Sequence, residues 1–144
     1  YRAIVLERGL QALPGVHDFL ERLRDAGVPC CIGSSTHREN IATIIHALGF
    51  EDFFAGMVTA EDVTHGKPHP DVFLQAAARI DRAPAQCVVF EDAFAGIEAA
   101  HAGGMKAVGG ATTHPAELLA GKADRVVRQL DELKVEDLAR MILK

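Results

Sequence analysis

The chain has 144 residues, a formal net charge of −5, 49% hydrophobic and 24% charged residues, a balance typical of one globular domain with a core of its own. The acidic charge and the lack of a basic run argue against nucleic-acid binding. No apolar run approaches the roughly 18 residues of a membrane span. Three cysteines, Cys30, Cys31 and Cys87, form no Cys-x-x-Cys pair. We therefore expect buried thiols in a reducing compartment.

Short apolar strands and amphipathic helices alternate along the chain. Residues 1–10 have a helical composition, and a break at Leu13-Pro14-Gly15 separates them from the next helix. The expected strands are 28–33, 53–58, 87–90, 105–108 and 124–127. The expected helices begin at Val16, near Ile41, at Pro70, at Phe94 and after Pro115, and a last one covers 135–143. This order predicts an α/β fold, a three-layer Rossmann-like parallel sheet with helices on both faces.

The most informative stretch is Cys87-Val88-Val89-Phe90-Glu91-Asp92. Its unbroken apolar run predicts a strand buried on both faces, so Glu91 and Asp92 should lie at the carboxyl edge of the sheet. Two adjacent carboxylates repel each other unless a cation or protons compensate them, and Mg²⁺ prefers such oxygen ligands. The alternative is a loop carboxylate followed by a helix N-cap.

Two other polar stretches follow strands at this edge. The hydroxyls and amides of Ser34-Ser35-Thr36 suit a phosphate, although Ser34 or Thr36 could equally cap a helix. Lys67 lies in a loop stiffened by Pro68 and Pro70, where it can place a charge between anions or be an ordinary surface lysine. Hydroxyls, lysine and carboxylates together favour a phosphoryl-transfer site.

Several histidines and one arginine are weaker candidates. His37 and Arg38 follow the hydroxyl stretch and could contact phosphate or substrate, although surface positions are the simpler interpretation. His65 and His69 flank Lys67, but two loop histidines without a third ligand favour a structural role.

These motifs resemble those of the haloacid dehalogenase-like hydrolases, within them the group of β-phosphoglucomutase and small phosphatases. The resemblance covers almost the whole chain and rests on residues 32–36, 66–73 and 89–92 together with Gly96. It implies that Ser34 hydrogen-bonds the phosphate and that Lys67 steadies nucleophile and phosphate. It also implies that Glu91 and Asp92 hold Mg²⁺.

One departure from the family pattern is serious. The family nucleophile is the first aspartate of an Asp-x-Asp motif on the central strand, and this chain contains no Asp-x-Asp. The chain therefore resembles the C-terminal part of such an enzyme, with residues 1–15 as the end of a helical cap and hinge and 16–144 as the core, incomplete at its N-terminus. We expect a missing strand between those ending at Ser34 and Glu91, leaving edges that an N-terminal segment or another chain completes. A lesser departure is Ala93, where many relatives have Ser.

The resemblance implies, for the full-length protein, a magnesium-dependent phosphatase that works through an aspartyl-phosphate on a small phosphorylated metabolite. The tail at 111–133 resembles phosphatases acting on flavin precursors, so a flavin-precursor phosphate stands beside a sugar phosphate as substrate. A β-phosphoglucomutase-like mutase and a non-catalytic subunit of the same fold are the alternatives. A receiver domain fits less well, because its acidic pair lies early and its lysine late. We expect no nucleic-acid or membrane partner, a cytoplasmic or plastid-stroma location, and no activity for residues 1–144 alone.

Overall fold

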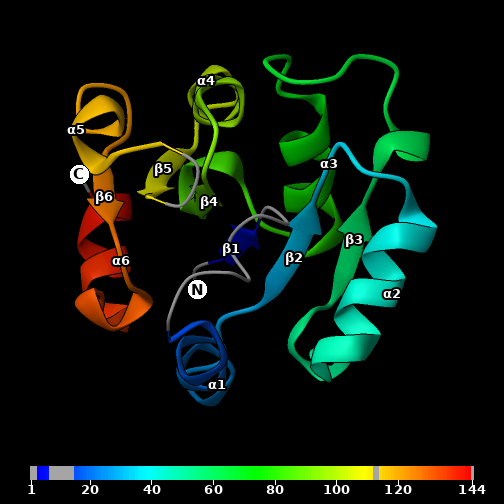
Figure 1. The fold of residues 1–144 in the computed structure, drawn as a ribbon, viewed down its shortest axis with the longest axis horizontal. Helices are drawn as coiled ribbons and strands as arrows, with labels where there is room; N and C mark the ends of the chain where they lie inside the picture. The colour runs from blue at the N-terminus through cyan, green and yellow to red at the C-terminus, as the bar shows by residue number, and fades with distance from the viewer. Residues whose placement is uncertain (1–2, 7–14, 112–113, 144) are drawn as a thin grey trace.

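The computed structural model describes residues 3–6, 15–111 and 114–143. Within them, six parallel strands form one sheet in the order β3-β2-β1-β4-β5-β6 (Figure 1). The strands are β1 (Ala3–Leu6), β2 (Cys30–Gly33), β3 (Gly56–Val58), β4 (Cys87–Glu91), β5 (Lys106–Gly110) and β6 (Arg125–Val127). The helices are α1 (Val16–Asp25), α2 (Arg38–Leu48), α3 (Asp71–Arg79), α4 (Phe94–Ala102), α5 (Ala116–Leu119) and α6 (Val135–Leu143). The expected fold class is confirmed.

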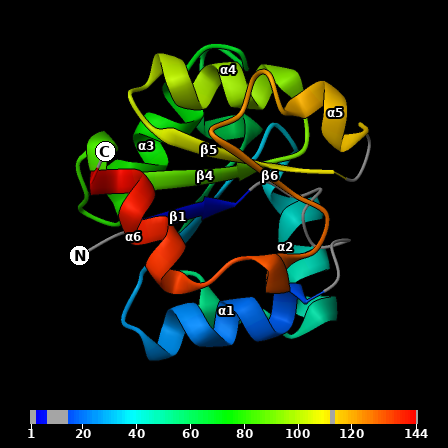
Figure 2. The ribbon, with the colours of Figure 1, turned by 90° about the vertical axis from the view of Figure 1, so that its left-hand side faces the viewer.

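Helices cover both faces of the sheet, with α3, α4 and α5 on one side and α1, α2 and α6 on the other (Figure 2). Alternate residues of each strand point to opposite faces, so neighbouring side chains enter different cores. In β4, Val89 belongs to the core under α3 and α4, whereas Phe90 packs at 5.4 Å between ring centroids against Phe19 of α1. All five residues of β4 are buried, as its apolar run predicted.

The central strand corrects one expectation. We expected helix over residues 1–10 and a gap between β2 and β4, but Ala3–Leu6 form β1 and occupy that place. Its register pairs Leu6 with both Ile32 and Phe90. The physical reason is that β-branched Ile4 and Val5 suit a strand, and a strand here satisfies the inward-facing backbone groups of both neighbours. Residues 1–2 and 7–14 lie outside the described residues, so the cap and hinge over 1–15 stay a prediction there.

Turn residues end helices where the sequence indicated. Gly27 and Gly49 follow α1 and α2 with φ of 74° and 69°, the left-handed region in which glycine carries no Cβ penalty. The strand expected over 53–58 is shorter, because a 3₁₀ turn, η2 (Glu51–Phe53), occupies its start. The aromatic rings of Phe50 and Phe53 pack there at 5.6 Å, which holds the turn against α1.

The three cysteines are free and buried, as expected. Burial raises the pKa of the Cys30 thiol to about 12, and it raises the pKa of Cys31 and of Cys87 to about 11. These thiols are therefore protonated at neutral pH and poor nucleophiles. In the part of the chain that the structure describes, no helix combines the length and apolarity needed to cross a bilayer.

Candidate active site

The predicted site residues gather at the carboxyl edge of the sheet. Ser34 directly follows β2 and Glu91 ends β4, and these strands flank β1 on its two sides. Because neighbouring strands lie about 4.8 Å apart, the two strand ends are separated by roughly 10 Å. Both Ser34 and Glu91 are buried, with 0% and 1% of their surface exposed.

Lys67 reaches this edge from the loop that precedes α3. Its Nζ lies 3.2 Å from Oε2 of Glu91, and the two side chains are only 9% and 1% exposed. The ammonium also lies 5.1 Å from the ring centroid of Phe73, the geometry of a cation–π contact. The Lys67–Pro68 peptide bond is cis. The Lys67 side chain is thus a largely buried cation at the site, and the interpretation as an exposed surface lysine is wrong.

The other oxygen of Glu91 is held by the start of α4. Its Oε1 accepts hydrogen bonds from the backbone N–H groups of Asp92 at 3.2 Å and Ala93 at 3.1 Å. A Cβ on Gly96 would lie 2.0 Å from the Glu91 carboxyl carbon, so only glycine fits at this helix position. The motif residue Gly96 therefore makes room for the carboxylate.

The segment Ser34-Ser35-Thr36, which we name the hydroxyl loop, does not cap a helix. The N-cap residue of α2 is His37, and no side chain caps the helix, so Ser34 and Thr36 are not its caps. Ser34 donates its backbone N–H to the Val58 carbonyl at 2.9 Å, and its Oγ accepts the N–H of Thr36 at 3.1 Å. Ser35 is exposed between them. The alternative that Asp92 is a helix N-cap is also wrong, because the N-cap residue of α4 is Ala93.

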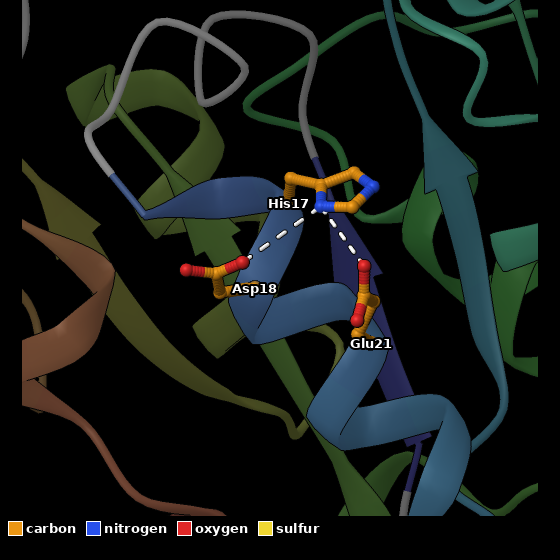
Figure 3. Close-up of side chains that lie close together, drawn as sticks. All are labelled: His17, Asp18 and Glu21. Carbon is orange, nitrogen blue, oxygen red and sulfur yellow. Dashed lines mark ion pairs between the residues drawn. The ribbon is translucent and has the colours of Figure 1, made fainter.

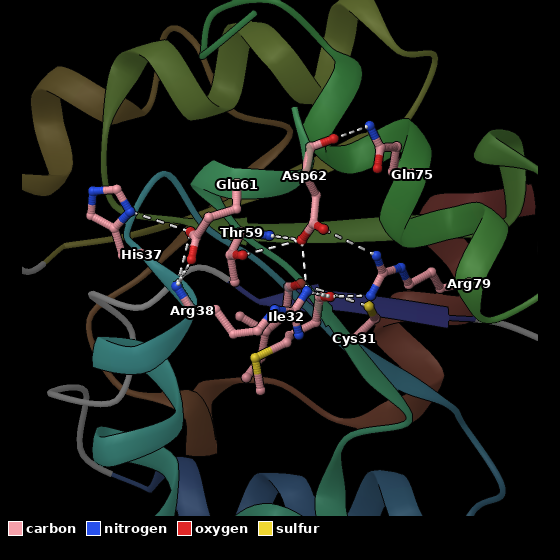
Figure 4. Close-up of polar contacts among 10 residues, drawn as sticks. Cys31, Ile32, His37, Arg38, Thr59, Glu61, Asp62, Gln75 and Arg79 are labelled. Atoms are coloured by element: carbon pink, nitrogen blue, oxygen red, sulfur yellow. Dashed lines mark hydrogen bonds and ion pairs between the residues drawn. The ribbon is translucent and has the colours of Figure 1, made fainter. Parts of the chain in front are cut away.

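His37 and Arg38 contact protein groups. The His37 ring lies 3.3 Å from a Glu61 oxygen, and Arg38 Nη2 donates to Asp62 at 2.7 Å (Figure 4). Their contact with substrate stays a prediction. The sequence reasoning missed Asp62, although the spacing of Thr59 and Asp62 is that of a capping box.

The other histidines near this edge, His65, His69 and His114, make local contacts. The rings of His65 and His69 lie 5.0 Å apart, and His69 Nδ1 accepts the N–H of Asp71. His114 stacks on Phe94 at 4.4 Å. These contacts are those of loop residues that stabilise turns, as expected for His65 and His69.

Glu91 and Asp92 are the candidate magnesium ligands. They supply hard carboxylate oxygens at the strand end, and Mg²⁺ is commonly bound through one or two carboxylates plus waters and substrate phosphate. Lys67 and two amides already orient Glu91, which is the kind of outer contact that fixes a ligand. The residues present therefore fit this ion.

Another group of possible ligands lies on α1. Among the described residues, His17, Asp18 and Glu21 are the one set of three whose ligand atoms all lie within 4.8 Å of one another. His17 Nδ1 is 3.1 Å from Glu21 and 3.8 Å from Asp18 (Figure 3). Their side chains are 43% to 86% exposed, so an ordinary surface ion pair accounts for them.

The parallel sheet and the polar residues at its carboxyl edge agree with the class of hydrolases to which comparison with known proteins assigns the chain. The family of haloacid dehalogenase-like hydrolases matches residues 1–104, and the chain belongs to this family. It is 39% identical over 127 residues to the 5-amino-6-(5-phospho-D-ribitylamino)uracil phosphatase, chloroplastic, of Arabidopsis thaliana, covering 88% of this chain and 34% of that protein. It is 40% identical over 124 residues to the β-phosphoglucomutase of Bacillus subtilis, covering 86% of this chain and 52% of that protein.

The fold is also similar to that of a solved structure from the same group of proteins. The β-phosphoglucomutase of Clostridium difficile superposes with a TM-score of 0.80 at 27% identity, covering 94% of this chain and 58% of that one. The chain thus spans between a third and three-fifths of the length of these relatives.

Proposed function

We propose that the full-length protein containing this chain is a magnesium-dependent phosphatase for a small phosphorylated metabolite. The observation that carries the proposal is the buried Lys67–Glu91 pair at the carboxyl edge, with Ser34 at the neighbouring strand end. A buried ion pair is a weak source of stability, and burying one at a ligand-binding edge favours a functional role. Family membership supports phosphoryl transfer as that role.

Each residue has a distinct part in the proposed reaction. The Ser34 hydroxyl donates a hydrogen bond to a phosphate oxygen, and Lys67 neutralises charge that develops on the phosphoryl group. Glu91 keeps the Lys67 ammonium in place through its 3.2 Å contact. Glu91 and Asp92 would hold Mg²⁺, which would supply charge stabilisation for the phosphoryl oxygens. The attacking group in the proposal is an aspartate outside this chain, which forms an aspartyl-phosphate.

The substrate proposal follows the relatives. Similar proteins include a phosphatase for a phosphoribitylamino-uracil, a bifunctional riboflavin kinase/FMN phosphatase and a fructose-1-phosphate phosphatase. We propose a flavin-precursor phosphate or a sugar phosphate, in a reducing compartment such as cytoplasm or plastid stroma that suits three free thiols. The likeness to β-phosphoglucomutases favours a sugar phosphomutase as the second candidate. If the full-length protein shows no turnover, the alternative of a non-catalytic subunit with the same fold is favoured.

The test is a magnesium-dependent phosphate-release assay with p-nitrophenyl phosphate on the full-length protein. Asp92→Asn should abolish the magnesium-stimulated activity, because one anionic ligand is lost, and leave the circular dichroism spectrum native, because the substitution keeps the size of a half-buried side chain. Asp52→Asn, an exposed aspartate in η2, is the matched control and should keep full activity.

The same assay separates the alternatives. Residues 1–144 expressed alone should release no phosphate, because no residue among them matches the family nucleophile. Normal turnover by Asp92→Asn would remove Asp92 from the metal site. Turnover by residues 1–144 alone would show that the nucleophile is misassigned.

A further inference from the structure

Asp62 is at the centre of a polar network beside the hydroxyl loop (Figure 4). It ends a 3₁₀ turn, η3 (Ala60–Asp62), that follows β3. Its Oδ2 accepts the backbone N–H of Thr59 at 2.8 Å and the Thr59 hydroxyl at 3.1 Å. Thr59 is fully buried. The hydrogen bond from the Thr59 N–H is the main cause that lowers the pKa of the Asp62 carboxyl, so Asp62 is charged at neutral pH.

Two arginines from different helices converge on this carboxylate. Arg38 of α2 donates from Nη2 to Asp62 Oδ2 at 2.7 Å, and Arg79 of α3 lies 3.6 Å from Oδ1. Both guanidinium groups also donate to the Met57 carbonyl. We name Asp62, Thr59, Arg38 and Arg79 the Asp62 clamp. It joins α2, β3 and α3, which follow one another along the chain, at one point.

The clamp continues into the hydroxyl loop through backbone contacts. The N–H of Ala60 donates to the Thr36 carbonyl at 3.1 Å, and the N–H of Arg38 lies 3.1 Å from both oxygens of Glu61. The N–H of Ser34 donates to Val58 at 2.9 Å. The loop is therefore fixed at its beginning, middle and end by the segment that Asp62 organises.

The clamp also anchors the loop that carries Lys67. This loop runs from Asp62 to the start of α3. Gln75 of α3 donates from Nε2 to the Asp62 carbonyl at 3.0 Å and to Asp71 Oδ1 at 3.2 Å, which joins the two ends of the loop. One aspartate is thus connected to both segments that hold the candidate phosphate-binding groups.

We propose that Asp62 is a positioning residue for the phosphate, setting the relative placement of Ser34 and Lys67 through the Asp62 clamp. The inference rests on the proposed function. The side chains of the three charged clamp residues, Asp62, Arg38 and Arg79, are 22% to 43% exposed, so their ion pairs add little stability. Their effect lies in geometry, because a misplacement of about 1 Å at a site can lower the rate about 100-fold.

Asp137 offers a matched control at the other edge of the sheet. It accepts the N–H of Lys134 at 2.9 Å and lies 3.8 Å from Arg125 and 3.4 Å from Arg140. It is 17% exposed, against 22% for Asp62. Arg125 opens β6, so this second cluster lies at the amino edge, away from the candidate site. The two aspartates differ mainly in where they lie.

The experiment compares Asp62→Asn, Arg38→Met, their double variant and Asp137→Asn in the full-length protein. We measure KM and kcat for p-nitrophenyl phosphate, the inhibition constant of inorganic phosphate, and the amide hydrogen exchange of Ser34 and Ala60. Asp62→Asn and Arg38→Met should each raise the phosphate inhibition constant and KM about tenfold, and the double variant should be no worse than Asp62→Asn, since both single changes act on the Arg38–Asp62 ion pair. In the same variants, the backbone amides of Ser34 and Ala60 should exchange hydrogen faster than in the wild-type protein. Asp137→Asn should leave these quantities within about twofold of wild type.

Three outcomes overturn the proposal. The first is a phosphate inhibition constant unchanged by Asp62→Asn, and the second is an equal change in Asp137→Asn. The third is a loss of affinity in Arg38→Met alone, which would make Arg38 a direct phosphate ligand. An inactive wild-type protein would refute only the proposed function. In that case the amide exchange measurement tests the positioning role of Asp62. Unchanged exchange of Ser34 and Ala60 in Asp62→Asn would show that Asp62 does not hold the hydroxyl loop in place.

Discussion

Replacement of Gly96 by alanine tests whether the Glu91 carboxylate has the environment described. The new Cβ would lie 2.0 Å from both Cδ and Oε2 of Glu91 and 2.3 Å from its Cγ, inside van der Waals contact. The carboxylate cannot move aside freely, since it is 1% exposed and accepts hydrogen bonds from Lys67 and two amides. Gly96→Ala must therefore shift α4 or displace Glu91.

The expected magnitude follows from these two contributions. Overpacking in a buried site costs about 1–3 kcal/mol. Loss of the charged hydrogen bond between Lys67 and Glu91 adds about 1.5–3 kcal/mol. We expect the free energy of unfolding of the full-length protein to fall by about 3 kcal/mol or more, and phosphatase turnover to fall at least tenfold.

Urea unfolding followed by circular dichroism measures the loss, beside the magnesium-dependent assay. Gly121→Ala is the control, because no heavy atom lies within 4 Å of the Cβ it would add, and its unfolding free energy should stay within about 0.5 kcal/mol of wild type. If Gly96→Ala behaved like Gly121→Ala in both assays, the close packing of α4 on Glu91 would be refuted.

The remaining predictions concern the lysine and the thiols. Lys67→Ala should lower turnover at least ~100-fold, as for other single electrostatic contacts, and Lys67→Arg should rescue little; retained activity would make Lys67 dispensable. Cys30, whose pKa burial raises to about 12 against about 9 when unfolded, should resist iodoacetamide at pH 8 in the native state and react after unfolding, as read by mass spectrometry of its peptide. Because its raised pKa favours the neutral thiol, the stability it contributes is complete below pH 9 and is lost as pH rises towards 12, and rapid native labelling would contradict its burial.

The sequence predicted the parts of the site that local patterns determine. The apolar run ending in Glu91 fixed β4 and its carboxylates, since a strand of that composition belongs inside a parallel sheet. The position of Lys67 could be predicted only as far as its loop. Its contact with Glu91 depends on how α3 packs on the sheet, and no spacing along the chain contains that information.

The errors and omissions have the same origin. Ala3–Leu6 were expected to be helical because helix and strand differ little for four apolar residues, and pairing with two neighbours decided between them. The role of Asp62 was missed because its arginine partners come from two other helices. The capping box of Thr59 was visible in the sequence, but it indicates only a local turn.

The position of β1 also has a consequence for the order in which the chain can assemble. It pairs Ala3 with Cys87 on one side and Ile4 with Cys30 on the other, so its second set of hydrogen bonds must wait until the segment around Cys87 is available. Closing so long a loop carries an entropic penalty, and contacts distant in sequence slow folding. During synthesis these four residues leave the ribosome before either partner. The innermost strand of the described sheet therefore precedes both of its partners along the chain and becomes fixed late.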